Sequence, residues 1–153
     1  MAKMIWDNVG EKYYETGVEQ CALFVYDKNI LDKAKRYANG VPWNGLTGVT
    51  EKPSGAEVTD LWANDAKYGS MIAAEKFGCS IEAYTYPKEW LACDGIKELA
   101  PGAYVGQQNR ATFGLAYKTL IGNDEDNLDH GYKLHLIYGC LASPSEKARK
   151  TVN

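Results

Sequence analysis

The sequence has very little histidine, with only His130 and His135 among 153 residues. Neither lies in an H-x-x-x-H spacing and no C-x-x-C pair occurs, so the usual donor pattern of a zinc site is missing. No G-x-S-x-G motif is present, and the glycines at 102 and 106 lack the Lys-Ser/Thr of a phosphate-binding loop. A nucleophile also needs a base oriented by a third group. The sequence therefore predicts no catalytic residue, metal or cofactor, and an enzyme is the least favoured class.

Basic residues are not in excess either. Lys and Arg number 17 against 20 Asp and Glu, which gives a formal net charge of −3. This balance argues against a nucleic-acid-binding protein, which needs a positively charged surface. It is compatible with a surface along which DNA passes without binding. Long apolar runs are missing, and residues 1–10 contain no signal-peptide core, so we expect synthesis and folding in the cytoplasm.

The four cysteines, Cys21, Cys79, Cys93 and Cys140, are far apart in the sequence. Without a secretion signal we expect all of them to be reduced and buried or half-buried. Tyrosine is abundant, with 11 copies against 3 of Phe. It suits half-buried strands and surfaces that meet other proteins. The length favours a single domain over residues 1–153.

Frequent Gly, Pro, Asn and Asp residues divide the chain into short segments, which is typical of a β-rich fold. Strand patterns occupy residues 17–26, 56–63 and 79–86. The clearest strand pair is an antiparallel hairpin, in which residues 112–118 and 132–138 alternate and flank a polar loop, 122–127.

Helical signals are few. Residues 29–38 predict a short helix or helical turn with Asn29 as a cap, and residues 88–93 predict a short helix that ends at Asp94-Gly95. Residues 143–146 match a capping box that could begin a last helix. Propensity alone favours a helix over residues 70–78, whereas the Gly- and Pro-rich residues 41–49 predict an extended, loop-like arm.

The acidic residues between 123 and 129 could suggest calcium. An EF-hand loop that began at Asp124 would need Gly at its sixth position and Glu at its twelfth, where the sequence has Asp129 and His135. The pattern fails, and a solvated hairpin tip is the better interpretation.

Several segments, in order along nearly the whole chain, carry a more specific pattern. They are YETGV (14–18), VPWNGLT (41–47), TEKPSGA (50–56), FGCSIEAYTYP (77–87), CDG (93–95), GQQ (106–108), FGL (113–115), GND (122–124) and GYKLHLIYGCLA (131–142). Together these segments resemble the major tail-tube proteins of siphophages and related prophages of Gram-positive bacteria. Residues 27–40 are longer and more helix-prone than the family's loop, and the chain is expected to be short at its C-terminus relative to that family.

The resemblance implies a structural virion protein. The expected fold is mainly β, a two-sheet β-sandwich or barrel of the phage tail-tube type with one short flanking α-helix and a long inter-subunit loop. Hexameric rings would stack into a tail tube whose lumen conducts DNA without specific binding. The partners implied are further copies of the chain and the tape-measure, baseplate and tail-terminator proteins, and the location implied is the virion tail. A sheet edge is prone to pair with another chain, and a closed ring removes such edges.

Within this framework residues 27–55 are expected to form the arm that reaches a neighbouring subunit or ring. The predicted interface residues are Trp43, Asn44, Gly45 and Leu46, with Trp43 and Leu46 as apolar anchors. The alternative is an ordered surface loop on its own subunit. The resemblance also changes the expectation for residues 70–78 from helix to strand, and the lumen is expected to be neutral to acidic.

Two other functions stay open. The first is a tube-end or baseplate ring protein on the same fold. The second is a small-ligand-binding β-barrel with tyrosines lining its interior, which would be a monomer with a saturable ligand.

Overall fold

The computed structural model describes residues 2–37, 39–106, 109–144 and 151, and within them the fold is mainly β with one short α-helix, as predicted. The strands are β1 (Tyr14–Val25), β2 (Gly40–Trp43), β3 (Leu46–Glu51), β4 (Ser54–Gly55), β5 (Val58–Ala63), β6 (Ala66–Ile72), β7 (Glu75–Lys76), β8 (Cys79–Ala83), β9 (Ile96–Ala100), β10 (Ala103–Gly106), β11 (Phe113–Asn123) and β12 (Asn127–Cys140). The helix α1 spans Trp90–Cys93, and a 3-10 helix, η1, spans Lys33–Lys35.

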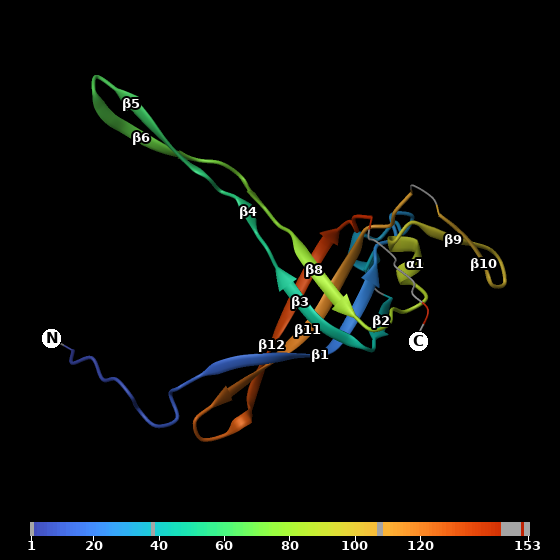
Figure 1. Ribbon diagram of the computed structural model, residues 1–153, viewed down its shortest axis with the longest axis horizontal. Helices are drawn as coiled ribbons and strands as arrows, with labels where there is room; N and C mark the ends of the chain where they lie inside the picture. Colours follow the sequence, from blue (N-terminus) through green and yellow to red (C-terminus); the bar gives the residue numbers. More distant parts are fainter. Residues whose placement is uncertain (1, 38, 107–108, 145–150, 152–153) are drawn as a thin grey trace. The chain divides into compact units, whose positions relative to one another are not determined.

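The chain divides into two compact units. The first contains residues 1–46 and 84–153, and the second contains residues 47–83. The first unit holds a four-stranded antiparallel sheet in the order β12-β11-β1-β2, with β9 and β10 paired separately (Figure 1). The second unit is built from β3 to β8.

The core of the first unit lies on one face of the four-stranded sheet. Leu115 in β11 pairs with Leu23 in β1 on one side and with Ile137 in β12 on the other, so the three side chains lie abreast on that face. Their exposed fractions are only 1%, 0% and 8%. Burial of such aliphatic side chains is the main stabilising term, at about 1.5–3 kcal/mol each.

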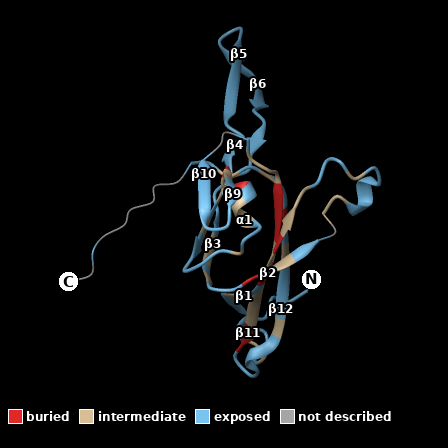
Figure 2. Ribbon diagram, turned by 90° about the vertical axis from the view of Figure 1, so that its right-hand side faces the viewer, coloured by how far each residue is buried: buried red, intermediate tan, exposed pale blue. Residues whose placement is uncertain are grey.

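The helix α1 packs on the same face through Trp90. The Trp90 ring lies 5.1 Å from the Trp43 ring and 5.0 Å from the Phe113 ring, measured between centroids. Such aromatic pairs contribute about 0.5–1.5 kcal/mol beyond the area they bury. The helix ends at Cys93 with Asp94 as its C-cap, and the next residue, Gly95, has a positive φ of 74° that suits glycine. Figure 2 shows the buried residues of the first unit.

The second unit is one long antiparallel hairpin, which we call the ribbon (residues 47–83). Its strands pair successively as β3–β8, β4–β7 and β5–β6. The tip between β5 and β6 is Asn64-Asp65, whose φ angles of 51° and 57° are those of a type I′ turn, the turn that best matches strand twist. No residue of the ribbon is buried, and β5 and β6 are exposed throughout their length apart from half-buried Gly69 (Figure 2).

Most of the strand predictions are confirmed. β1, β5 and β8 lie in the three segments predicted as strands, 17–26, 56–63 and 79–86. β11 and β12 form the expected hairpin, although its turn is shorter than predicted because Asn123 pairs with Asn127. Residues 70–78 contain β-structure, as the resemblance and not the propensity predicted. The helix predicted at 88–93 is α1.

Other predictions need correction. The helical turn expected within 29–38 is η1, but its cap is Asp32, whose side chain accepts a hydrogen bond from the Ala34 amide. Residues 41–49 are not loop-like, because they supply β2 and the first part of β3. Pro42 is tolerated there because β2 is an edge strand. The last helix was predicted to begin in residues 143–146, and most of that prediction lies outside the described residues.

The location of the core predicts that two leucine substitutions change the free energy of unfolding by very different amounts. Leu23→Ala should lower the free energy of unfolding by about 2–5 kcal/mol, because Leu23 is fully buried. The matched control Leu31→Ala should change it by less than about 0.5 kcal/mol, because Leu31 is 96% exposed. Urea denaturation of the dilute protein measures both. Equal losses in the two variants would contradict this location of the core.

Candidate assembly interface

The outer edge of β12 is the longest open edge in the first unit. β12 spans 14 residues and stands at the end of the sheet, where it pairs with β11 alone among the described strands. An edge strand presents a row of unpaired N–H and C=O groups to which another chain can add. No Pro interrupts β12, and its apolar and polar residues alternate. β12 is therefore well suited to extend the sheet into another polypeptide.

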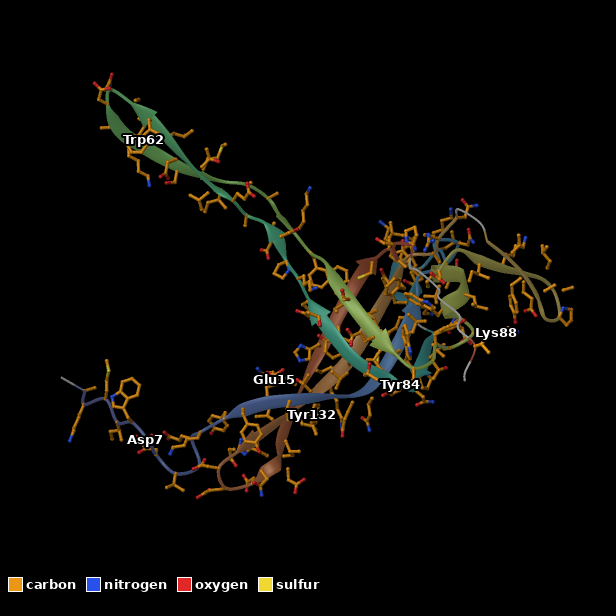
Figure 3. All side chains as sticks on the ribbon, in the orientation of Figure 1. Asp7, Glu15, Trp62, Tyr84, Lys88 and Tyr132 are labelled. Carbon is orange, nitrogen blue, oxygen red and sulfur yellow. The ribbon has the colours of Figure 1, made fainter. Side chains whose placement is uncertain are left out.

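One face of β12 is apolar and exposed. This face is opposite to the one that carries buried Ile137. It presents every second residue of the strand, Tyr132, Leu134, Leu136 and Tyr138, and we call these four residues the β12 column. Their exposed fractions are 64%, 62%, 70% and 80%. Single exposed apolar residues are ordinary, but a contiguous row of them marks an interaction surface. Figure 3 labels Tyr132 at the first residue of this column.

The opposite end of the sheet is also open in part. β2 pairs only with residues 21–24 of β1, so among the described strands nothing covers the outer edge of residues 14–20. Where β2 ends, a groove of about 460 Å³ lies between residues 18–22 and residues 42–46. This groove contains all four predicted interface residues, Trp43, Asn44, Gly45 and Leu46.

The four predicted residues differ in what they can offer a neighbour. Trp43 is only 6% exposed, and its indole N–H donates a hydrogen bond to the Thr85 carbonyl at 2.8 Å. Trp43 was expected to be an apolar anchor in a neighbouring subunit. Its ring instead belongs to the core of its own chain and is not exposed to a neighbour. Asn44 and Gly45 are exposed and Leu46 is half-buried, and an interface role for them stays a prediction.

The segment predicted as one connecting arm, residues 27–55, is divided in the structure. Its first part precedes β2 in the first unit, β2 itself joins the four-stranded sheet, and residues 47–55 form one side of the ribbon. The ribbon carries the exposed apolar residues expected of an arm. Seven large apolar side chains of the ribbon are between 42% and 80% exposed: Val58, Leu61, Trp62, Tyr68, Met71, Ile72 and Phe77. Figure 3 labels Trp62 in β5.

A polar cluster occupies the core-side face of the sheet near the start of β1. Glu15 accepts hydrogen bonds from the Lys133 ammonium and the Thr119 hydroxyl, both at 2.6 Å. His135 Nε2 lies 2.9 Å from the Thr119 hydroxyl and 3.3 Å from Glu15, and its ring stacks on Tyr117. The Lys133 hydrogen bond, followed by that of Thr119, lowers the pKa of Glu15 to about 2. This cluster fixes β1, β11 and β12 together beside the open edge.

The acidic loop is a solvated hairpin tip, as predicted, but Asn123 and Asp124 also bind the backbone of residues 10–12, and we call these two residues the clamp. Asp124 accepts hydrogen bonds from the backbone amide of Gly10 at 3.0 Å and from that of Lys12 at 3.4 Å. Asn123 is buried, and its side-chain amide donates to the Gly10 carbonyl at 3.2 Å. The Asp126 carboxylate lies 3.0 Å from His130 Nδ1. Sequence reasoning missed the clamp because its partners lie more than 100 positions apart.

The cysteines and the charged groups show no further site in the described part of the chain. Cys21 and Cys93 are buried, Cys79 and Cys140 are half-buried, and none of the four is in a disulfide, as predicted. Burial raises the pKa of the Cys21 and Cys93 thiols to about 11, which keeps them protonated and unreactive. Within the described ranges, no three His, Cys, Asp or Glu side chains gather as metal donors.

Comparison of the chain with family models, with curated proteins and with solved structures found no match. Among the described residues, no helix has both the length and the apolar character needed to cross a membrane.

The polar cluster predicts how acid affects stability. The folded-state pKa of Glu15, about 2, lies below its ordinary value of 4.5, so the ionised carboxylate stabilises the fold above pH 4.5 and this contribution is lost as the pH falls toward 2. Glu15→Gln should therefore melt a few degrees below the native chain near pH 6 and together with it near pH 2. The control Glu57→Gln, in an exposed carboxyl of the ribbon, should show no such convergence. Thermal scans across this pH range measure the effect, and a constant difference for Glu15→Gln would contradict it.

Proposed function

We propose that this chain is a structural building block that joins copies of itself, sheet edge to sheet edge, into rings that stack as a phage tail tube. The observation that carries the proposal is the β12 edge, where an open strand of 14 residues presents four apolar side chains that are 62–80% exposed. The resemblance of the sequence to tail-tube proteins supports the same function.

The sheet favours a head-to-tail contact between copies. Its order, β12-β11-β1-β2, places different strands at its two ends, so extension of the sheet brings β12 of one copy to the β1 and β2 end of the next. A contact between two different surfaces repeats from copy to copy, and it closes into a ring when the rotation permits. A closed ring of this kind leaves no edge unpaired.

A hexameric ring of this sheet would be wide enough for a conduit. Six four-stranded sheets joined edge to edge exceed the strand number at which β-barrels leave an aqueous channel. The net charge of −3 suits the passage of DNA, because each exposed Lys or Arg cluster would bind phosphates and retard it. The protein would thus act as the wall of the channel through which DNA leaves the virion.

The ribbon is the element proposed to join one ring to the next. A two-stranded hairpin is marginally stable alone in water, and this one buries none of its own side chains. Its exposed apolar residues need a covering surface, which a copy in the adjacent ring would supply. If the ribbon contacted only copies in its own ring, the chain would instead serve as a tube-end or baseplate ring on the same fold.

The small-ligand barrel is less favoured by the structure. Such a barrel must close within one chain to enclose its ligand. Here the four-stranded sheet is open, because within the described residues no strand joins β12 to β2. In the described part of the chain the apolar residues of the β12 column are 62–80% exposed, so they do not line an interior.

The β12 column predicts a loss of assembly without a loss of folding. In the double variant Leu134→Lys and Leu136→Lys, rings should fail to form, because buried unpaired ammonium groups are costly at an interface. The monomer should keep its melting temperature, because both residues are more than 60% exposed. Sedimentation velocity and electron microscopy read out assembly, with Leu31→Lys as a control. Tubes of normal appearance from the double variant would exclude the column from the interface.

The ribbon predicts a separation of ring formation from stacking. The variant Trp62→Ala with Tyr68→Ala removes two rings that are 69% and 80% exposed, and it should give single rings in place of tubes. Tyr84→Ala, which removes a ring that is 90% exposed outside the ribbon, is the matched control and should give tubes. Electron microscopy distinguishes rings from tubes. Long tubes from the ribbon variant would remove the ribbon from the ring-to-ring contact.

A further inference from the structure

The two ends of the four-stranded sheet carry opposite charge. The acidic loop, residues 123–129, contains the turn from β11 to β12, and it has four acidic side chains and no Lys or Arg. At the other end of the sheet, residues 27–36 follow β1 where β11 begins, and we call them the basic loop. The basic loop has four Lys or Arg side chains and two Asp. Because β11 has 11 residues, the two loops lie about 35 Å apart along the strands (Figure 1).

The basic loop is ordered, and its own acidic residues are already engaged. The Asp27 amide donates to the Arg36 carbonyl at 3.0 Å and closes the loop, and the Arg36 guanidinium donates to a backbone carbonyl inside it at 3.0 Å. The Asp27 and Asp32 carboxylates accept from backbone amides of the loop at 2.9 and 3.1 Å. Lys28 and Lys33 are exposed, and neither forms an ion pair within the described residues. The loop therefore presents positive charge on an ordered backbone.

The acidic loop is ordered in a similar way. The buried Asn123 side chain accepts hydrogen bonds from the amides of Glu125 and Asp126 at 3.1 and 2.6 Å. The clamp ties the same turn to the residues that precede β1. Glu125 and Asp129 are exposed, and neither carboxylate forms an ion pair in the part of the chain that the structure describes. Charges of opposite sign thus stand at the two ends of one sheet, each on an ordered turn.

A ring built from this sheet would place the two loops on opposite rims. Strands in a closed barrel are tilted by about 35–45° from the barrel axis, so the strand ends face the two openings. Cyclic symmetry gives every copy the same orientation, so all the acidic loops would lie on one rim and all the basic loops on the other. Rings stacked in one orientation would then bring the acidic rim of one ring against the basic rim of the next.

We infer that rings stack through contact between the acidic loop of one copy and the basic loop of a copy in the adjacent ring. This assignment rests on the proposed function and gives the tube a polarity, because two acidic rims or two basic rims repel each other. A single exposed ion pair is weak, but every copy around the rim repeats it, and the contacts act together. The partner is a second copy of this chain, because one chain carries both charged loops at opposite ends of the same sheet. The ribbon would add apolar contact between the same rings.

Charge reversal in the full-length protein tests the contact. The variant Lys28→Glu with Lys33→Glu makes both rims acidic, and the variant Glu125→Lys with Asp126→Lys and Asp129→Lys makes both rims basic. Each variant alone should form single rings in place of tubes, because like rims repel. A mixture of the two variants should form tubes again, since acidic rims then meet basic rims. Electron microscopy and sedimentation velocity distinguish rings from tubes, and thermal scans check that each variant folds.

The control Lys3→Glu with Lys97→Glu changes the net charge as much as the first variant does, at two exposed residues in neither loop, and it should form tubes. Salt gives a second measurement on the native chain. The concentration needed for tubes should rise by at least about tenfold between about 0.1 and 1 M NaCl, because the Debye length falls from about 10 to about 3 Å. The concentration needed for rings should not rise, because apolar burial and strand pairing hold them.

Tubes of normal length from either reversal variant alone would overturn the assignment, as would single rings from their mixture or native tubes that are insensitive to salt. These outcomes would leave the proposed rings intact. A native chain that stays monomeric at high concentration would overturn the proposed function as well.

Discussion

Within the described part of the first unit, the buried core lies on one face of the four-stranded sheet, and the rest of the structure follows from that constraint. Leu23, Leu115 and Ile137 are buried on the face that α1 covers, whereas the β12 column on the opposite face is 62–80% exposed among the described residues. A sheet stabilises a domain by burying apolar residues, and a sheet with apolar residues on both faces satisfies only half of that requirement alone. In the proposed assembly the chain folds on its buried face, and the other face contacts a neighbouring copy.

The two ends of the sheet differ in a way that gives association a direction. The β12 edge is long and free of interruption, but the open part of β1 contains two register shifts, and Gly17 and Gln20 there have positive φ. Bulges of this kind blunt an edge and discourage indiscriminate pairing. Pairing of one β12 with another is disfavoured for a ring, because an isologous contact stops at a dimer. In the proposed ring, a contact between unlike ends, aided by apolar burial at the β12 column, would add copies in one direction only.

Alternation of apolar and polar residues was enough to predict β8, β11 and β12, and apolar runs bounded by turn residues were enough to predict β1 and β5, because these signals are local in the sequence. They failed for residues 41–49, where Gly and Pro suggested a loop, since only pairing with residues 21–24 of β1 makes β2 a strand. The same pairing buries Trp43, which had been expected to anchor in a neighbour. The clamp at Asp124 was not predictable, because a hydrogen bond across 114 positions leaves no local signal. The sequence could not show which strands would stand at the ends of the sheet, because that depends on pairing between distant segments. That some strand edges would be exposed was predicted.

The ribbon and the residues that precede β1 (2–13) differ from the core in the same way as the exposed face of the sheet does. Neither buries a side chain in the described residues, and yet both carry aromatic and aliphatic residues that water solvates poorly. Ordering such segments costs conformational entropy, which a single chain does not recover from contacts of its own. In the proposed tube a neighbouring copy would cover these segments and so recover the cost. The stability of the segments would then rise with protein concentration, whereas the stability of the core would not. Assembly would then complete the fold of each copy, and a finished tube would be more stable than the sum of its separate chains.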